Sequence, residues 1–114
     1  MIAYKVVRSE NKKLVSVLIA WGVRYIIGKK TVLRKNCGPL CVFETEDFAK
    51  NFCRHLIEDG SERVYKCKIK KSRKKHVWYT VDCGSSFFRS RSTIEKLPEG
   101  TILADEVTLL ERVK

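Results

Sequence analysis

Residues 45–71 read TEDFAKNFCRHLIEDGSERVYKCKIKK, and this stretch decides the fold. Its first half predicts a helix over residues 46–59, because Thr45 can cap the start and Gly60 can end it in the left-handed conformation. Apolar residues recur within it at helical spacing, namely Phe48, Ala49, Phe52, Cys53, Leu56 and Ile57. Its second half, residues 63–71, alternates apolar and basic residues as a strand does. We therefore expect one amphipathic helix that packs by one face on a sheet.

The rest of the chain predicts strands and turns. The apolar and β-branched runs that predict further strands are residues 2–8, 14–20, 23–27, 31–33, 40–44, 76–81, 101–103 and 106–113. We expect residues 76–81 to form a hairpin with residues 63–71 across the polar loop 71–75. Turns are expected at residues 9–13, 28–30 and 97–100 and at Asp105-Glu106, with residues 34–39 as a loop. The predicted class is α+β, a curved, mostly antiparallel sheet around a single helix, in one compact domain over residues 1–114.

Composition and charge restrict the class of protein. The 114-residue chain carries 24 Lys and Arg against 13 Asp and Glu, and this net charge of +11 attracts polyanions or acidic surfaces. The longest apolar run, residues 14–23, is shorter than the roughly 20 residues that span a bilayer, and residues 1–8 lack the features of a signal peptide. We expect a cytosolic protein without a membrane partner, whose five cysteines are reduced thiols.

The spacing of cysteines and histidines argues against a metal site. Cys37 and Cys41 are followed by Cys53 and His55, which together offer three thiolates and an imidazole. In a helix, however, Cys53 and His55 project about 200° apart, so they cannot easily hold one ion. The thiols that could still form a split site are Cys37, Cys41, Cys67 and Cys83, without support from a second short-spaced pair. We therefore expect neither a metal nor another cofactor.

The sequence predicts no catalytic residues. His55 and His76 are the only imidazoles, neither GxGxxG nor GxxxxGK[ST] occurs, and the acidic pairs are typical of helix ends and turns. The alternative that stays open is a small enzyme with a pocket near His76 and Cys83, where Cys83-Gly84-Ser85-Ser86 could present a nucleophile.

Basic residues are concentrated between residues 66 and 75, and this is the strongest functional signal. A basic two-stranded ribbon has the size to lie along a nucleic-acid groove, with Trp78 available to stack on an unpaired base, and residues 87–91 add a second aromatic and basic cluster. The candidate nucleic-acid-binding residues are Lys66, Lys68, Lys70, Lys71, Arg73, Lys74, Lys75, Trp78, Arg89 and Arg91. Protection of an edge strand against aggregation would explain the first three lysines but not the loop charges. The sequence thus predicts a non-enzymatic module that binds nucleic acid or an acidic protein surface.

The order of several short motifs resembles a family of small, mostly uncharacterised proteins encoded by phages and other viruses. The motifs are YKVV at residues 4–7, YIIGKKT at 25–31, LCVF at 40–43, VYKCKI at 64–69, PEGT at 98–101 and ADEVTLL at 104–110. The resemblance covers nearly the whole chain and rests mainly on residues of the expected core and turns. It implies a viral accessory protein that acts inside a host cell, in the inhibition of host defence or in nucleic-acid binding.

Overall fold

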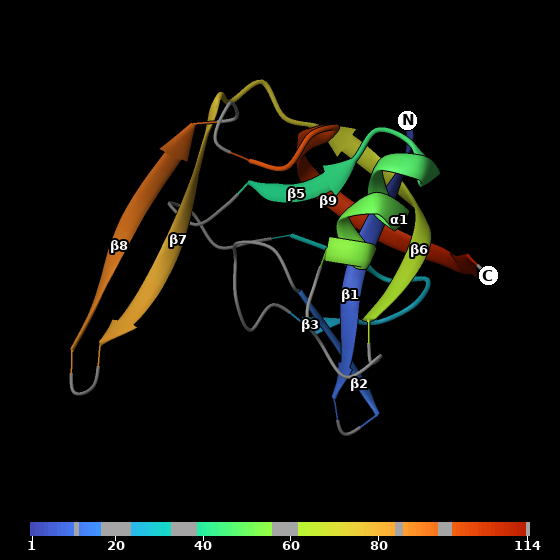
Figure 1. Ribbon diagram of the computed structural model, residues 1–114, viewed down its shortest axis with the longest axis horizontal. Coiled ribbons are helices and arrows are strands. Elements are labelled where there is room, and N and C mark those ends of the chain that lie inside the picture. The colour runs from blue at the N-terminus through green and yellow to red at the C-terminus, as the bar shows by residue number, and fades with distance from the viewer. Residues whose placement is uncertain are drawn as a thin grey trace.

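The computed structural model describes residues 1–10, 12–16, 24–32, 39–55, 62–83, 86–93 and 97–113, of which residues 77–83 and 86–93 are described by their backbone course. Within these residues the chain forms one helix, α1 (Glu46–His55), and nine strands (Figure 1). The strands are β1 (Ile2–Glu10), β2 (Lys13–Ser16), β3 (Arg24–Tyr25), β4 (Lys30–Thr31), β5 (Leu40–Phe43), β6 (Glu62–Lys71), β7 (His76–Cys83), β8 (Ser86–Thr93) and β9 (Thr101–Val113). The strands pair in antiparallel fashion. The α+β class with a mostly antiparallel sheet is therefore confirmed.

Seven strands form one sheet, and the other two form a separate hairpin. Neighbours in the larger sheet follow the order β3-β2-β1-β5-β9-β4, and β6 pairs with both β1 and β9. The pairings therefore close a ring of four strands, β1, β5, β9 and β6. Within the described residues β7 and β8 pair with each other alone, and their hairpin stands beside the larger sheet in Figure 1.

Buried side chains form two apolar clusters on opposite faces of β1 and β6. The first consists of Ala3, Val7, Tyr25, Leu40, Val42, Tyr65, Cys67, Ile69, Ala104, Val107 and Leu109. The second consists of Val6, Phe43, Ala49 and Val64, with Tyr4, Phe48, Phe52, Cys53 and Val113 packed against it. Neighbours such as Val6 and Val7 belong to different clusters, because successive side chains of a strand point to opposite faces. Helix α1 thus covers one face of the sheet (Figure 1). The first cluster fills the other face.

The predicted helix starts where the sequence indicates. The Thr45 hydroxyl accepts a hydrogen bond from the Phe48 backbone N–H at 3.2 Å, which satisfies one of the free donors at a helix start. Phe52 packs its ring against that of Phe43, with centroids 5.3 Å apart. The described part of the helix runs to His55, so the predicted end at residues 56–60 lies outside the described residues. No helix within the described ranges is long and apolar enough to cross a membrane.

The predicted partner of β6 is wrong. Residues 76–81 were expected to pair with residues 63–71, but β7 pairs with β8, and β6 lies between β1 and β9. The reason lies in the loop that was expected to be the hairpin turn. The Ser72 backbone N–H donates to the Leu103 carbonyl at 2.8 Å, so the chain continues along β9 instead of turning back on β6. Because β6 has a neighbour on each side, its alternating lysines do not protect a sheet edge.

The C-terminal third contains two further corrections. Asp105-Glu106 was expected to be a turn, yet both residues lie inside the continuous strand β9, where Glu106 is opposite Lys70. Residues 86–93, which had no predicted strand, form β8. The predicted turn at residues 97–100 is confirmed, with the Thr101 N–H donating to the Pro98 carbonyl at 3.1 Å.

The N-terminal hairpin is confirmed with a tighter turn than expected. β1 runs to Glu10 and β2 begins at its partner Lys13, and residues 17–20 of the predicted second strand lie outside the described residues. The predicted strands at 23–27 and 31–33 appear as the shorter β3 and β4, and most of the predicted loop 34–39 lies outside the described ranges.

Candidate nucleic-acid interface

Residues 71–75, which we call the basic segment, connect β6 to the hairpin and are anchored at one residue. Ser72 is buried, and its N–H is bonded to Leu103. Its hydroxyl accepts a hydrogen bond from the Lys74 N–H at 3.1 Å, which holds the following residues in a tight local turn. The cations on either side of Ser72 are exposed, namely Lys71, Arg73, Lys74 and Lys75. The fold therefore presents four positive charges on a short segment fixed to β9.

These four cations differ in their surroundings from Lys66 and Lys70 of β6. Among the residues that the structure describes, no acidic side chain forms an ion pair with any of the four. On β6, by contrast, Lys66 Nζ lies 4.0 Å from Glu111 Oε1 and Lys70 Nζ lies 3.9 Å from Glu106 Oε2. Such exposed pairs are weak, but they offset the positive potential locally. The basic segment therefore carries four positive charges that no carboxylate of the described residues offsets.

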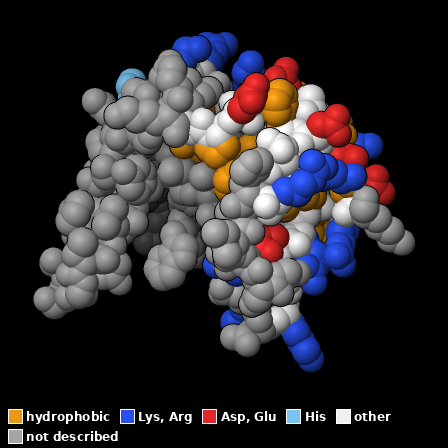
Figure 2. Space-filling view, viewed as in Figure 1, with side chains coloured by type: hydrophobic (Ala, Val, Ile, Leu, Met, Phe, Trp, Pro, Cys, Tyr) orange, Lys and Arg blue, Asp and Glu red, His pale blue; other side chains and the backbone are white. Residues whose placement is uncertain are grey.

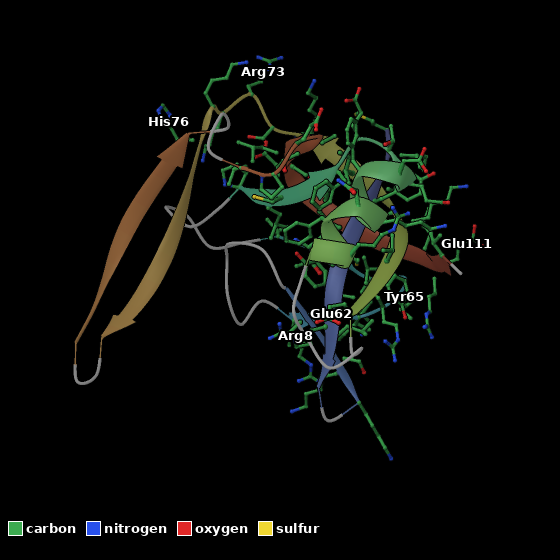
Figure 3. The ribbon with its side chains drawn as sticks, viewed as in Figure 1. Arg8, Glu62, Tyr65, Arg73, His76 and Glu111 are labelled. Carbon is green, nitrogen blue, oxygen red and sulfur yellow. The ribbon has the colours of Figure 1, made fainter. Side chains whose placement is uncertain are left out.

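The figures place this charge at the end of the molecule where β6 leads to the hairpin. Lys and Arg side chains gather at the upper end of the face drawn in Figure 2, near the histidine. Figure 3 identifies Arg73 and His76 at that end, with Glu111 far from them, near the C-terminal end of β9. The carboxylate that pairs with Lys66 is therefore remote from the basic segment.

The hairpin register brings the remaining candidate residues together. Trp78 is opposite Arg91, and Thr80 is opposite Arg89. Because alternate positions of a strand share a face, positions 78, 89 and 91 belong to one face of the β7–β8 ladder. The sequence had placed Trp78 on a strand beside β6 and left Arg89 and Arg91 in a separate cluster. The structure unites these three positions on one hairpin that starts directly after the basic segment.

The structure does not bring His76 and Cys83 together. They are the first and last residues of β7, paired with Thr93 and Ser86 at opposite ends of the hairpin. Residues seven positions apart in an extended strand, such as these two, have Cα atoms about 23 Å apart. This distance is far beyond the reach of a hydrogen bond. A nucleophile and a base must lie within hydrogen-bond reach, so these two residues do not form such a pair.

The described thiols belong to the core. Cys41 and Cys67 are buried, and Cys53 of helix α1 is half-buried against the second apolar cluster. Burial raises the pKa of Cys41 to about 11 and that of Cys67 to about 12, so both are protonated thiols at neutral pH. Within the described ranges no three His, Cys, Asp or Glu side chains are grouped so that they could hold a metal ion, whereas Cys37 lies outside those ranges.

Lys5 is a buried cation that the sequence analysis missed. It is 1% exposed, and its ammonium donates a hydrogen bond to the Cys41 backbone carbonyl at 2.7 Å. Its Nζ also lies 5.5 Å from the centroid of the Tyr25 ring, a cation–π distance. Burial lowers the pKa of Lys5 to about 8. The sequence pattern that could have indicated its burial is the position of Lys5 between Ala3 and Val7, on one otherwise apolar face of the strand.

Comparison with known proteins adds no relative to this description. No protein-family model, curated protein or solved structure matches the chain.

Proposed function

We propose that this protein is a non-enzymatic module that binds nucleic acid, with the basic segment and the adjoining β7–β8 hairpin as its binding surface. The observation that supports this best is the basic segment, where four exposed cations have no acidic partner among the described residues and Ser72 fixes the chain. Cations without a partner are available to neutralise phosphates, and neutralised phosphates release their counterions. A fixed segment also loses less conformational entropy when it binds than a free loop does.

The hairpin has the shape that this function requires. A two-stranded ribbon fits the major groove of a duplex, which is about 12 Å wide. Positions 89 and 91 carry arginines that could contact phosphates, and position 78 carries a tryptophan that could stack on an unpaired base. We also propose that the larger sheet is curved, because β6 joins β1 and β9 while β5 joins the same two strands.

The resemblance to small viral proteins extends the proposal to a biological setting. We propose that the chain is a viral accessory protein that acts in the host cytosol. An acidic protein surface is the alternative partner, because it would offer the same negative charge to the basic segment.

Binding measured as a function of salt tests the proposal. Labelled single- and double-stranded DNA and RNA are titrated with the protein, and the binding constant is followed from low to moderate salt. If the four cations of the basic segment each contact a phosphate, the slope of log K against log salt is about −3 to −4. Absence of binding at low salt, or a flat salt response, would overturn the proposal. Binding to poly-glutamate without binding to nucleic acid would identify the acidic protein surface instead.

A further inference from the structure

A groove of about 280 Å³ lies on the outer face of the sheet, where β4, β9 and β6 run side by side. Its lining residues are Lys30, Lys68, Ile69, Lys70, Glu106 and Thr108. Thr108 on β9 is opposite Lys30 on β4 and opposite Lys68 on β6. These three residues therefore form a row across three strands, with a hydroxyl between two lysines. Neighbouring strands are about 4.8 Å apart, so the two lysines start from backbones roughly 10 Å apart and can reach one anion above Thr108.

The groove is lined by three lysines and one carboxylate, which pairs with two of them. Glu106 Oε1 lies 3.2 Å from Lys30 Nζ, and its Oε2 lies 3.9 Å from Lys70 Nζ. Lys68 has no ion pair with any described residue. The lining therefore carries three positive charges and one negative charge. This excess attracts a second anion into the groove.

The ion pairs of Glu106 can be exchanged at low cost. The side chains of Lys30 and Lys70 are 61% and 70% exposed, whereas that of Glu106 is 31% exposed. Exposed lysines are held only weakly by such pairs and can turn toward a new anion. Glu106 is the more enclosed partner and stays beside the groove. It would then act as a built-in competitor that limits how tightly an anion binds.

We propose that this groove binds a phosphate group of a nucleic-acid backbone, with Lys68, Lys30 and the Thr108 hydroxyl as donors. The inference rests on the proposed function and adds a second contact region to it, because β6 runs from Lys68 directly into the basic segment. Contacts of this kind fix the position of a nucleic acid on a protein without reading its sequence. Glu106 lowers the affinity of the site for phosphate, because it competes with the phosphate for Lys30.

Two substitutions with opposite expected effects test the site, each beside a control with the same change in charge. Lys68→Gln is expected to weaken binding of a short single-stranded oligonucleotide by up to about fivefold and to reduce the steepness of the salt slope by about 0.7. Glu106→Gln is expected to tighten binding, because it releases Lys30 and Lys70. The controls are Lys50→Gln and Glu46→Gln, which break an ion pair of 2.9 Å on helix α1, whose residues do not line the groove. Thermal melting of all four variants verifies that they are folded.

The outcomes separate this inference from the proposed function. If the wild-type protein binds the oligonucleotide but Lys68→Gln and Glu106→Gln behave like their helix controls, the groove inference is wrong and the proposed function stands. If the wild-type protein binds neither this oligonucleotide nor double-stranded DNA or RNA, both are wrong. A titration with inorganic phosphate, followed by the backbone amide NMR signals of Lys68 and Thr108, identifies the source of the phosphate. Signals that shift with inorganic phosphate but not with the oligonucleotide would overturn the inference in favour of a free phosphate ligand.

Discussion

The ammonium of Lys5 lies inside the sheet beside several neutral groups. The Cys41 carbonyl accepts its hydrogen bond at 2.7 Å, the Tyr25 ring lies beside it, and the nearby thiols stay protonated at neutral pH. Burial removes water from the ammonium and so disfavours its charged form, and this is the main cause of the lowered pKa of about 8. Lys5 therefore weakens the fold at neutral pH.

The stability of the protein is expected to rise with pH because of Lys5. Its pKa is about 8 in the folded state against 10.5 in the unfolded chain, so the unfolded chain holds more protons between these two values. Stability rises wherever the unfolded state binds more protons, here by about 3 kcal/mol across that interval. Urea unfolding of the wild-type protein and of Lys5→Met, followed by circular dichroism, measures this. The raised thiol pKa values act in the opposite direction, but both proteins share them.

We expect the unfolding free energy of the wild type, relative to that of Lys5→Met, to increase as the pH rises from 8 to 10.5. A difference that stays constant over this interval would show that Lys5 has an ordinary pKa and is not buried as described.

At the scale of elements, the turn before β9 packs tightly beneath the start of helix α1. Gly100 has a φ of +84°, and its carbonyl accepts a hydrogen bond from the Glu44 N–H at 2.8 Å. A Cβ atom on Gly100 would lie 2.2 Å from Phe48 Cγ and 2.6 Å from Phe48 Cβ. The clash involves the Cβ atom of Phe48, so rotation of the ring about the Cβ–Cγ bond cannot relieve it. Glycine is therefore required both for the backbone conformation and for the contact between turn and helix.

Gly100→Ala is expected to destabilise the protein by about 2 to 5 kcal/mol, from the left-handed backbone and the overpacking together. Gly28→Ala is the matched control, because Gly28 has a φ of +83° but nothing within 4 Å of its added Cβ. The control is expected to lose about 1 to 2 kcal/mol, the backbone part alone. Denaturant unfolding of both variants measures the difference. Equal losses in the two variants would mean that the turn does not press on Phe48.

The elements also show which parts of the structure could be predicted from the sequence. The start of α1 and the alternation of β6 depend on neighbours within a few residues, so Thr45 and the pattern around Cys67 were sufficient. Alternation determines which face of a strand is buried, but it does not identify the strands beside it. The pairing of β6 with β1 and β9 was therefore missed, and with it the position of Glu106 opposite Lys70. The groove beside Glu106 depends on that long-range pairing.

Across the whole molecule, the acidic and basic charges are distributed unevenly. Glu106 and Glu111 on β9 offset part of the charge of the β6 lysines, whereas the basic segment has no such partner among the described residues. The net charge of +11 would attract any polyanion at long range. The central claim is more specific, because it assigns binding to the basic segment rather than to total charge. A test of it must therefore compare two proteins of equal net charge.

That test is binding and thermal melting of Arg73→Glu/Lys74→Glu/Lys75→Glu beside the control Lys13→Glu/Arg24→Glu/Arg54→Glu. Each set of three reversals lowers the net charge by six at exposed positions, and the control positions lie on β2, β3 and α1. Both variants are expected to melt within a few degrees of the wild type, since exposed sites contribute little to stability. The first variant is expected to bind single-stranded DNA at least about a hundredfold more weakly than the wild type, and the control much less so. Equal weakening of the two folded variants would contradict the assignment of binding to the basic segment.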